Sequence, residues 1–386
     1  MEFLPMSIYL DNAATSYPKP PSVISAVVSA MTEAGANPGR GSHDLSIRAA
    51  ELLFHTRETV CRYFGAEDPM DFFFTLNCTD ALNTAIKGLL NQGDHAITSI
   101  YDHNSVLRPL EYLKRSNKID YSTAFPDKNG KITVDCIRRL MRPETKMVVL
   151  SHISNVTGQI CDITEIGAYC REKKVLFITD AAQSAGIIPF NLKDMPIDIL
   201  CTAGHKGLYG PQGSGILYIR SGIDAEPLRH GGTGSLSDSI DQPILRPDRY
   251  ESGTVALPAI AGLCKGIEML EKAGNYPQRH ESELAQRLMQ ALRKINGLVI
   301  YSPENTQGGI VACNIAGIDS GLTAQELNRR FAIACRSGLH CAPLAHRYLG
   351  TFQSGIVRFS IGMFNTAEEI DRTAEAMKEL AAEFTI

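Results

Sequence analysis

The chain has 386 residues, of which 44% are hydrophobic, and its formal net charge is only −4. This size allows a large core and favours two domains. A small negative charge without a basic cluster argues against binding to nucleic acid or to an anionic membrane. Residues 1–7 show no secretory signal, and no stretch is long and uncharged enough to span a bilayer. We therefore expect a cytoplasmic protein.

Ten cysteines are scattered singly along the chain, without a Cys-x-x-Cys pair. In a reducing compartment most of them are expected to be small buried hydrophobic residues. Cys136, Cys170 and Cys313 have apolar neighbours and fit that expectation. Only Cys341 lies in a setting that suggests another role.

Apolar residues at helical spacing predict a helix over residues 46–64, in which His55 is expected to be a packing or surface histidine. A strand over residues 72–76 and a helix over residues 81–90 flank the polar turn that begins at Asn77. The turn exposes backbone N–H groups at the positive end of the helix dipole, which suits a phosphate. Capping of the helix by Asn77 or Thr79 uses the same geometry.

Three more apolar strands, over residues 96–100, 147–151 and 175–179, each end in polar residues that include His103, Asn155 and Asp180. A helix near residues 165–172 precedes the last of them. This alternation predicts an α/β fold with a mostly parallel sheet and helices on both faces, whose ligands gather at the carboxyl ends of the strands. Taken alone, a histidine in this position is more often structural, and Asp180 is more often a helix cap.

Strands over residues 197–201 and 216–219 enclose a glycine-rich turn that carries His205 and Lys206. A lysine between two core strands loses hydration, which lowers its pKa and leaves an amine that can attack a carbonyl group. An exposed loop lysine is the alternative. One helix and one strand are expected between Asp180 and Lys206, which would place the two residues on adjacent strands.

The remaining chain predicts helices over residues 259–272 and 278–295 and strands over residues 298–301 and 309–315. Capping boxes at Thr323 and Thr366 predict two further helices. A strand over residues 356–360 carries Arg358 inside an apolar pattern, although a surface arginine is the alternative. We expect a large domain over residues 18–262 and a smaller α/β domain formed by residues 263–386 with 1–17.

Several motifs occur in the order found in class V aminotransferases, from Tyr9 to about Thr366. The segment from Asp198 to Tyr218, with Gly-His-Lys at its centre, resembles the pyridoxal-phosphate attachment site of that family. The opening at 9–15, the 37–43 segment and the 250–254 segment are similar to family segments too. Arg-Ser-Gly-Leu-His-Cys-Ala at 336–342 resembles the loop of cysteine desulfurases and selenocysteine lyases of the short-loop branch. The resemblance implies fold type I and pyridoxal 5'-phosphate as cofactor.

The resemblance also implies roles for individual residues. Lys206 would carry the cofactor, His103 would stack on its ring and move protons, and Asp180 would pair with the ring nitrogen. The full implied cofactor-binding set is Cys78, Thr79, His103, Asn155, Asp180, Gln183, His205, Lys206 and Thr254. Thr254 would reach the phosphate of the neighbouring subunit, which implies a homodimer with shared active sites. The chain departs from the family at Asn77, Asp80 and Val255-Ala256, and also at Ala203, where Thr202 or backbone groups would replace a phosphate-binding serine.

The implied reaction converts L-cysteine to L-alanine and leaves a persulfide on Cys341, whose thiolate His340 and Arg336 could stabilise. Arg358, Asn155 and His340 would bind the substrate, and a sulfur-acceptor protein is a possible partner. The alternatives are a selenocysteine lyase, another class V lyase in which Cys341 is incidental, and a scaffold without turnover. Cys341 could also be an inert core residue, a redox partner of Cys335, or a metal ligand with His340 and His346. The ligand spacing argues against that metal site, and we expect no metal.

Overall fold

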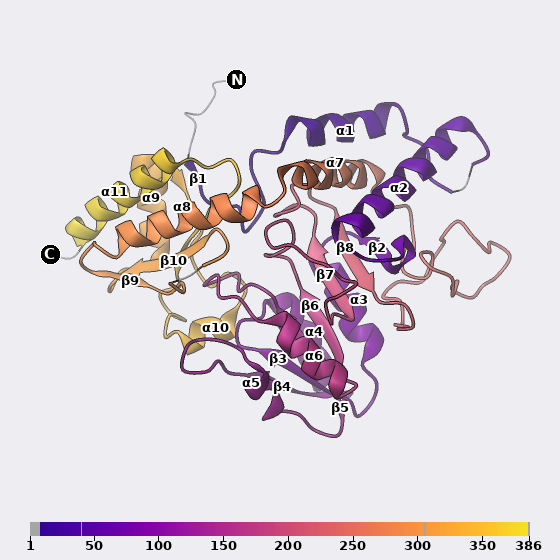
Figure 1. Ribbon diagram of the computed structural model, residues 1–386, viewed down its shortest axis with the longest axis horizontal. Coiled ribbons are helices and arrows are strands. Elements are labelled where there is room, and N and C mark those ends of the chain that lie inside the picture. Colours follow the sequence, from indigo (N-terminus) through magenta and orange to yellow (C-terminus); the bar gives the residue numbers. More distant parts are fainter. Residues whose placement is uncertain (1–7, 40, 305, 385–386) are drawn as a thin grey trace.

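The computed structural model describes residues 8–39, 41–304 and 306–384 (Figure 1). Arg40, within the 37–43 segment that resembles the family, lies outside the described residues, as do residues 1–7 and 385–386 of the expected smaller domain. Among the described helices, none combines the length and the apolar character that crossing a membrane requires.

A seven-stranded sheet forms the centre of the larger part of the molecule. β8 is antiparallel to both of its neighbours, and the other neighbouring pairs are parallel. The α/β fold with a mostly parallel sheet is therefore confirmed. In spatial order the strands are β2 (Phe72–Thr75), β8 (Gly215–Ile219), β7 (Ile199–Ala203), β6 (Leu176–Asp180), β5 (Thr145–Ser151), β3 (His95–Ser99) and β4 (Asp120–Ala124).

Both faces of this sheet are buried. Phe177 and Ile178 are neighbours in β6, yet they belong to hydrophobic clusters on opposite faces, as the alternation of side chains along a strand requires. Parallel sheets are stable when helices cover both faces. The helices of this part are α1 (Pro21–Thr32), α2 (Asp44–Tyr63), α3 (Cys78–Leu89), α4 (Asn104–Arg115), α5 (Val134–Arg138), α6 (Ile163–Glu172) and α7 (Leu257–Ala273).

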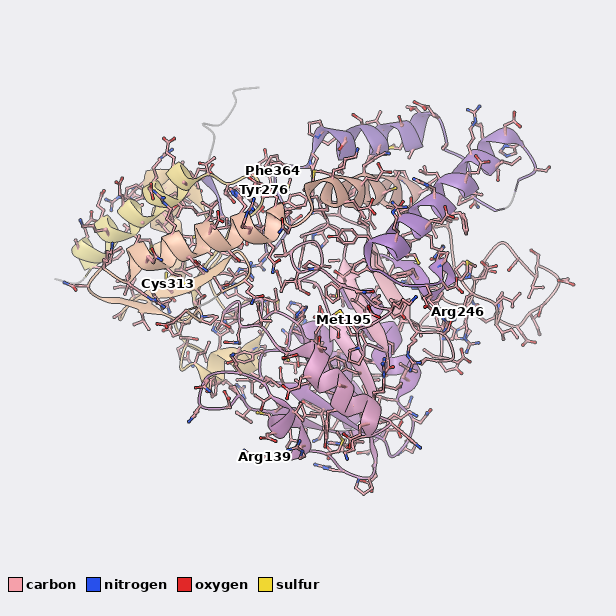
Figure 2. All side chains as sticks on the ribbon, in the orientation of Figure 1. Arg139, Met195, Arg246, Tyr276, Cys313 and Phe364 are labelled. Atoms are coloured by element: carbon pink, nitrogen blue, oxygen red, sulfur yellow. The ribbon has the colours of Figure 1, made fainter. Side chains whose placement is uncertain are left out.

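A second, antiparallel sheet has the order β12 (Val357–Ser360), β10 (Ile310–Ile315) and β9 (Leu298–Ile300). A separate hydrophobic cluster packs it against α8 (Tyr276–Leu292), α9 (Ser320–Phe331) and α11 (Ala367–Phe384). Figure 2 labels Cys313 in this region, where it is fully buried. β1 (Ile8–Tyr9) pairs with β11 (Ile333–Ala334), and α10 (Pro343–Tyr348) follows. The domain boundaries stay a prediction.

Several local expectations were wrong. β4 was not predicted, because this edge strand has the polar sequence Asp-Tyr-Ser-Thr-Ala and is mostly half-buried. Turns, and no α-helix, fill residues 181–198, all of which the structure describes. Asp319, rather than Thr323, caps α9, whereas Thr366 and Glu369 form the expected capping box. Cys136 is partly exposed.

Candidate active site

A cavity of about 500 Å³ of empty space lies at the carboxyl ends of β3, β5 and β6. Parallel strands that end at one edge of a sheet bring the residues after them together, as the register of Ser151, Asp180 and Cys201 shows. Eight of the nine residues implied to bind a cofactor line it, namely Cys78, Thr79, His103, Asn155, Asp180, Gln183, His205 and Lys206. Thr254 does not.

Lys206 lies in the turn between β7 and β8, with its side chain facing this cavity. Burial lowers the pKa of the Lys206 amine, and the neighbouring Cys78 and Asp180 only partly oppose that shift. A lysine with a lowered pKa supplies the neutral amine that nucleophilic attack requires. The alternative of an exposed loop lysine is wrong.

Two helices begin at one end of the cavity. Asn77 caps α3 by accepting a hydrogen bond from the Asp80 N–H group at 3.0 Å. The hydroxyl group of Thr79 lies 2.7 Å from that of Ser105, in the first turn of α4. His205 adds a buried Nδ1 atom without a hydrogen-bond partner in the described residues. Hydroxyl groups at two helix N-termini suit a phosphate.

Ser105, which the sequence did not single out, lines the same cavity as Ala203, where a phosphate-binding hydroxyl group was sought. Thr202 cannot supply that group, because its hydroxyl donates to the Ala181 carbonyl at 3.1 Å and is fully buried. The expectation that Thr202 replaces the serine was therefore wrong. The sequence signal for Ser105 was its position two residues after His103, the histidine that follows a predicted strand.

His103 caps α4 through its Nδ1 atom, which accepts a hydrogen bond from the Ser105 N–H group at 3.1 Å. This leaves Nε2 as the nitrogen that can meet a ligand in the cavity. Burial lowers the pKa of His103 to about 4, so the ring is neutral near pH 7. A neutral imidazole can accept or relay a proton.

Asp180, the last residue of β6, is buried at the base of the cavity. Its Oδ1 atom accepts hydrogen bonds from the Ala182 N–H group at 2.9 Å and from the Cys78 thiol at 3.4 Å. The helix-cap alternative for Asp180 is wrong, since turns follow it. The carboxylate is thus held at a fixed position in the same cavity as Lys206.

Asp102, which the sequence did not single out, directly precedes His103 and is fully buried. Its buried carboxylate accepts hydrogen bonds from the hydroxyl group of Thr98 and the N–H groups of Ser99 and Ser151, each at 2.6 Å. The contacts join the ends of β3 and β5. An aspartate three residues beyond a buried strand was the only signal in the sequence.

Arg358 is 2% exposed, so the surface-arginine alternative is wrong. Its Nη2 group donates to Asp11 Oδ1 and its Nη1 group donates to the Asn155 carbonyl, both at 2.9 Å. Its Nε group is buried and has no partner among the described residues. An unpaired buried N–H group is costly, and a carboxylate would satisfy it.

The loop that carries Cys341 is joined to the cavity wall through two backbone carbonyl groups. Asn155 Nδ2 donates to the His340 carbonyl at 2.6 Å, and the Asn104 N–H group donates to the Cys341 carbonyl at 2.7 Å. His340 and Cys341 have φ angles of 46° and 57°, which are strained for residues other than glycine. The Cys341 side chain is exposed, so it is not an inert core cysteine.

His340 does not supply a positive charge to this thiol. Its Nε2 group donates to the Ile356 carbonyl at 2.9 Å. Burial, reinforced by the charge of Arg358, lowers the pKa of His340 to about 3 and keeps the ring neutral. The expectation that His340 stabilises a thiolate was therefore wrong. Cys335 and Cys341 are both free thiols, so the redox pair is not formed.

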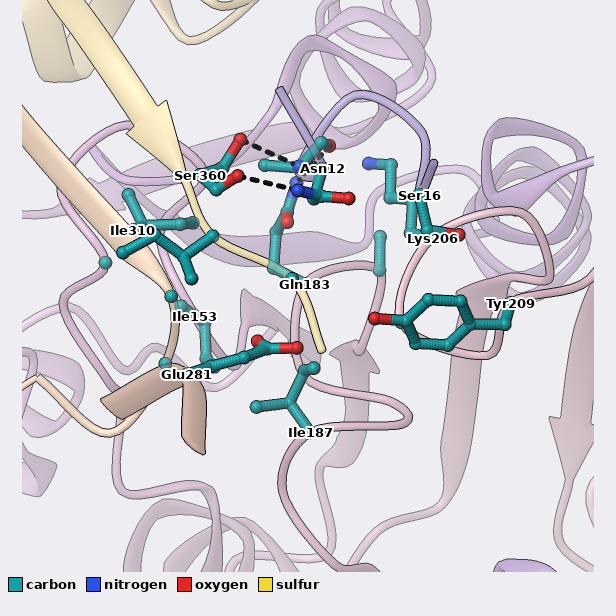
Figure 3. A pocket seen from close by; sticks show the side chains of 18 residues that line it. Asn12, Ser16, Ile153, Gln183, Ile187, Lys206, Tyr209, Glu281, Ile310 and Ser360 are labelled. Carbon is teal, nitrogen blue, oxygen red and sulfur yellow. Dashed lines mark hydrogen bonds between the residues drawn. The ribbon is translucent and has the colours of Figure 1, made fainter. Parts of the chain in front are cut away.

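A second hollow, with about 490 Å³ of empty space, adjoins the cavity and shares Gln183 and Lys206 with it (Figure 3). Glu281 of α8 and Tyr209 point toward one another across this hollow. Glu281 is 3% exposed, and burial raises the pKa of its carboxyl group well above the usual range. A buried acid in a helical apolar pattern gave no signal in the sequence.

Thr254 lies in another hollow, which also contains Phe54, Arg57 and Glu251. Arg57 and Glu251 form a buried bidentate ion pair with two contacts of 2.8 Å. Glu251 also accepts a hydrogen bond from the Phe74 N–H group at 2.7 Å. The segment before Thr254 is therefore fixed to α2 and β2, with Thr254 itself exposed.

The fold and the buried lysine cavity define a class of α/β enzymes, and comparison with known proteins gives the family. The family model for aminotransferase class-V matches residues 8–373, and the chain belongs to this family. It is 32% identical to a probable cysteine desulfurase of Methanothermobacter thermautotrophicus, over 97% of this chain and 94% of the relative. It is also 31% identical to the cysteine desulfurase IscS of Vibrio atlanticus, over 95% of this chain and 90% of the relative.

Solved structures show the same likeness. The apo structure of the cysteine desulfurase from Thermococcus onnurineus superposes with a TM-score of 0.90 at 31% identity, covering 98% of this chain and 95% of that one. The Escherichia coli cysteine desulfurase CsdA in its S-sulfonic acid form gives a TM-score of 0.88 at 25% identity, with the same coverage. The fold-type I architecture follows from this agreement.

Proposed function

We propose that the protein is a pyridoxal-phosphate-dependent cysteine desulfurase. The observation that carries this proposal is that two hydrogen bonds attach the loop of an exposed cysteine, Cys341, to the rim of a cavity lined by the half-buried Lys206. Relatives named as cysteine desulfurases match nearly the whole chain. Both observations favour sulfur removal over other chemistry of the family.

The cavity fits pyridoxal phosphate at three points. Thr79, Ser105 and the unpartnered His205 Nδ1 atom would hold the phosphate, and Asp180 would hold the ring nitrogen. Lys206 would bind the aldehyde carbon. When bound, the cofactor supplies an electron sink for carbanion chemistry at the α-carbon of an amino acid.

The protein's own groups then divide the remaining work. Arg358 would bind the substrate carboxylate, first through its unpartnered Nε group. Lys206, whose pKa burial lowers, would take the α-proton as a neutral amine. His103 would lie over the ring with its Nε2 group available for proton transfer, while the hydrogen bond from the Ser105 N–H group to Nδ1 keeps the imidazole in position.

Cys341 would attack the sulfur atom of the substrate as a thiolate. A sulfur–sulfur bond forms and the substrate Cβ–S bond breaks, with its electron pair left on the carbon side, which is later protonated. In the net reaction, L-cysteine and the Cys341 thiol give L-alanine and a Cys341 persulfide. Because the Cys341 side chain is exposed, an acceptor protein could take the sulfur from it.

The proposal includes a homodimer in which Thr254 serves the partner's cavity. Thr254 is exposed and lies outside the Lys206 cavity of its own chain. Exposed apolar side chains on α1 and in the segment before Thr254 support a subunit contact there: Ile24, Val28, Met31, Ile240, Ile244 and Leu245. Sedimentation of the purified protein as a monomer would contradict the dimer.

The test measures alanine and sulfide formed from L-cysteine, and alanine and selenide formed from L-selenocysteine. Cys341→Ala should abolish sulfide release, since Cys78, the other thiol that lines the cavity, is buried and donates its proton to Asp180 Oδ1. Cys136→Ala, which removes another partly exposed thiol, is the matched control and should keep wild-type activity.

Full sulfide release by Cys341→Ala would contradict the desulfurase. Selenocysteine cleavage that survives this change, with cysteine cleavage absent in the wild type, would identify a selenocysteine lyase. A protein that binds the cofactor but forms no alanine from either substrate would be a scaffold.

A further inference from the structure

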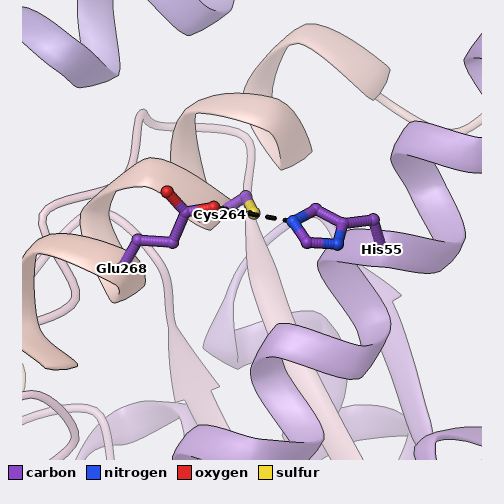
Figure 4. A group of neighbouring side chains, drawn as sticks. All are labelled: His55, Cys264 and Glu268. Carbon is purple, nitrogen blue, oxygen red and sulfur yellow. Dashed lines mark hydrogen bonds and ion pairs between the residues drawn. The ribbon is translucent and has the colours of Figure 1, made fainter.

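A cluster of three side chains outside the candidate active site joins α2 to α7 (Figure 4). Cys264 and Glu268 are one turn apart on α7, and His55 faces them from α2. Their imidazole nitrogen, sulfur and carboxylate oxygen atoms all lie within 4.8 Å of one another. These are the three ligand types that zinc takes from proteins.

The separations fit a tetrahedral ion. His55 Nε2 is 3.6 Å from Glu268 Oε1, and Cys264 Sγ is 3.5 Å from the same oxygen. Zinc bonds of about 2.0–2.3 Å at tetrahedral angles place neighbouring ligand atoms about 3.3–3.7 Å apart. Two of the three distances between ligand atoms therefore already have the required length. The third distance, between the His55 ring nitrogen and Cys264 Sγ, can shorten by rotation of His55, whose side chain is 54% exposed.

The cluster is also preorganised. Cys264 is 2% exposed, and the rigid α7 helix sets its position relative to Glu268. Lys265 donates to Glu268 Oε2 at 2.7 Å and so leaves Oε1 on the side of Cys264 and His55. A hydrogen bond to the oxygen that does not bind the metal, such as this one from Lys265, orients a metal-binding carboxylate.

We propose that His55, Cys264 and Glu268 bind a zinc ion, with water as the fourth ligand. Binding releases the thiol proton to solvent. The ion would link α2 to α7, which are far apart in the sequence, and would stabilise the folded chain by mass action. The three residues line neither cavity near Lys206, so this proposal does not depend on the proposed function.

The experiment is a zinc titration of the cofactor-loaded protein in competition with a chromophoric chelator. A Cys341→Ala background removes the exposed thiol, which could bind zinc by itself. We expect one zinc per chain, and Cys264→Ser should weaken binding about a hundredfold, as should His55→Ala at its exposed position. Cys136→Ser in the same background is the matched control and should bind zinc as the parent does.

Cobalt substitution identifies the ligand set independently. The parent and the Cys136→Ser variant should show visible bands of tetrahedral cobalt with a thiolate charge-transfer band, which Cys264→Ser should lose. Thermal melting of each variant without metal shows whether it is folded. Absence of zinc binding in the parent, or equal affinity of a folded Cys264→Ser or His55→Ala variant, would overturn the proposal.

Discussion

Two regions of the candidate active site are held in different ways. At the carboxyl ends of β3, β5 and β6, the buried carboxylates of Asp102 and Asp180 accept hydrogen bonds from neighbouring strands and turns. The Cys341 loop, in contrast, is attached to the cavity through two backbone carbonyl groups. Asp102 accepts three short hydrogen bonds from two strands. Cys341 has an exposed thiol and a left-handed backbone. The first region is built to hold groups still, and the second to present one reactive atom.

The difference matches two physical demands on a site of this kind. Groups that bind a cofactor and move protons act best when their positions are fixed in advance, because no reorganisation is then needed during reaction. A sulfur that has to leave the site needs access to solvent. Substitution of Lys206 or of Asn155 tests whether a change in one region affects the other.

The largest effect is expected for Lys206→Ala in the fixed region. Because Lys206 is the only lysine that lines this cavity in the described residues, the rate of alanine formation should fall by about 10⁴-fold or more. Covalent attachment of the chromophore should be lost as well. Alkylation of Cys341 with iodoacetamide should keep its rate, which would show that the loop is unaffected.

Lys19→Ala is the control for Lys206→Ala. Burial also lowers the pKa of Lys19, to about 8, but its amine donates to the His205 carbonyl at 2.9 Å and does not line the cavity. This variant should keep the chromophore. Covalently bound chromophore in Lys206→Ala would contradict the proposed site.

A smaller effect is expected when the link between the two regions is cut. Asn155→Ala removes the hydrogen bond to the His340 carbonyl, and a lost buried hydrogen bond corresponds to about a 10–100-fold change in rate. Hydrogen exchange at residues 340–342 should become faster. Asn83→Ala removes a 2.9 Å hydrogen bond to the Thr79 carbonyl on α3. This control should change neither the rate nor the hydrogen exchange at residues 340–342. Unchanged exchange in Asn155→Ala would show that this bond does not hold the loop.

Acid should destabilise the protein through its buried histidines. Burial lowers the pKa values of His103, His152 and His205 to about 4 and that of His340 to about 3. An unfolded histidine has a pKa of about 6.5, so unfolding takes up protons below that pH. This stability is fully present above about pH 6.5 and is lost as the pH falls toward 4.

Urea unfolding between pH 7.5 and 5 measures the effect. His340→Asn should reduce the slope of stability against pH, because one proton-binding group is removed. A wild-type stability that does not vary with pH in this range would contradict the neutral assignment of these histidines.

The smallest effect is expected at Glu281, beside the fixed region. Burial raises the pKa of its carboxyl group, so the folded state keeps a proton that the unfolded state loses above about pH 4.3. Stability from this group is present below that pH and is lost as the pH rises through the raised pKa. Glu281→Gln should therefore be more stable than the wild type by a margin that grows from pH 5 to pH 8.

Glu283→Gln is the control, on the same helix. Its carboxylate is 68% exposed and forms only a loose contact of 3.9 Å with Arg279. Because this carboxylate lies at the surface, Glu283→Gln should change the free energy of unfolding only slightly. A margin that stays constant for Glu281→Gln would show that Glu281 is ionised in the folded protein.

The sequence predicted those parts of the site that follow directly after buried strands. Lys206, Asp180 and His103 could be placed because apolar runs mark strands and strand order fixes where their ends meet. The turn at Asn77 was found because capping residues have a strong local signature.

Features that depend on packing between distant segments could not be predicted. The polar edge strand β4 has no apolar pattern, and the neutral state of His340 follows from burial beside Arg358. Glu281 lies on α8, which packs on the second sheet, and its side chain lines the second hollow. His55 and Cys264 come together only because α2 packs on α7.

The Asn104 N–H group that binds the Cys341 carbonyl belongs to the residue directly after His103. Any outward movement of the Cys341 backbone has to break this 2.7 Å bond. Movement of the Cys341 backbone away from the cavity is therefore coupled to the backbone that directly follows His103.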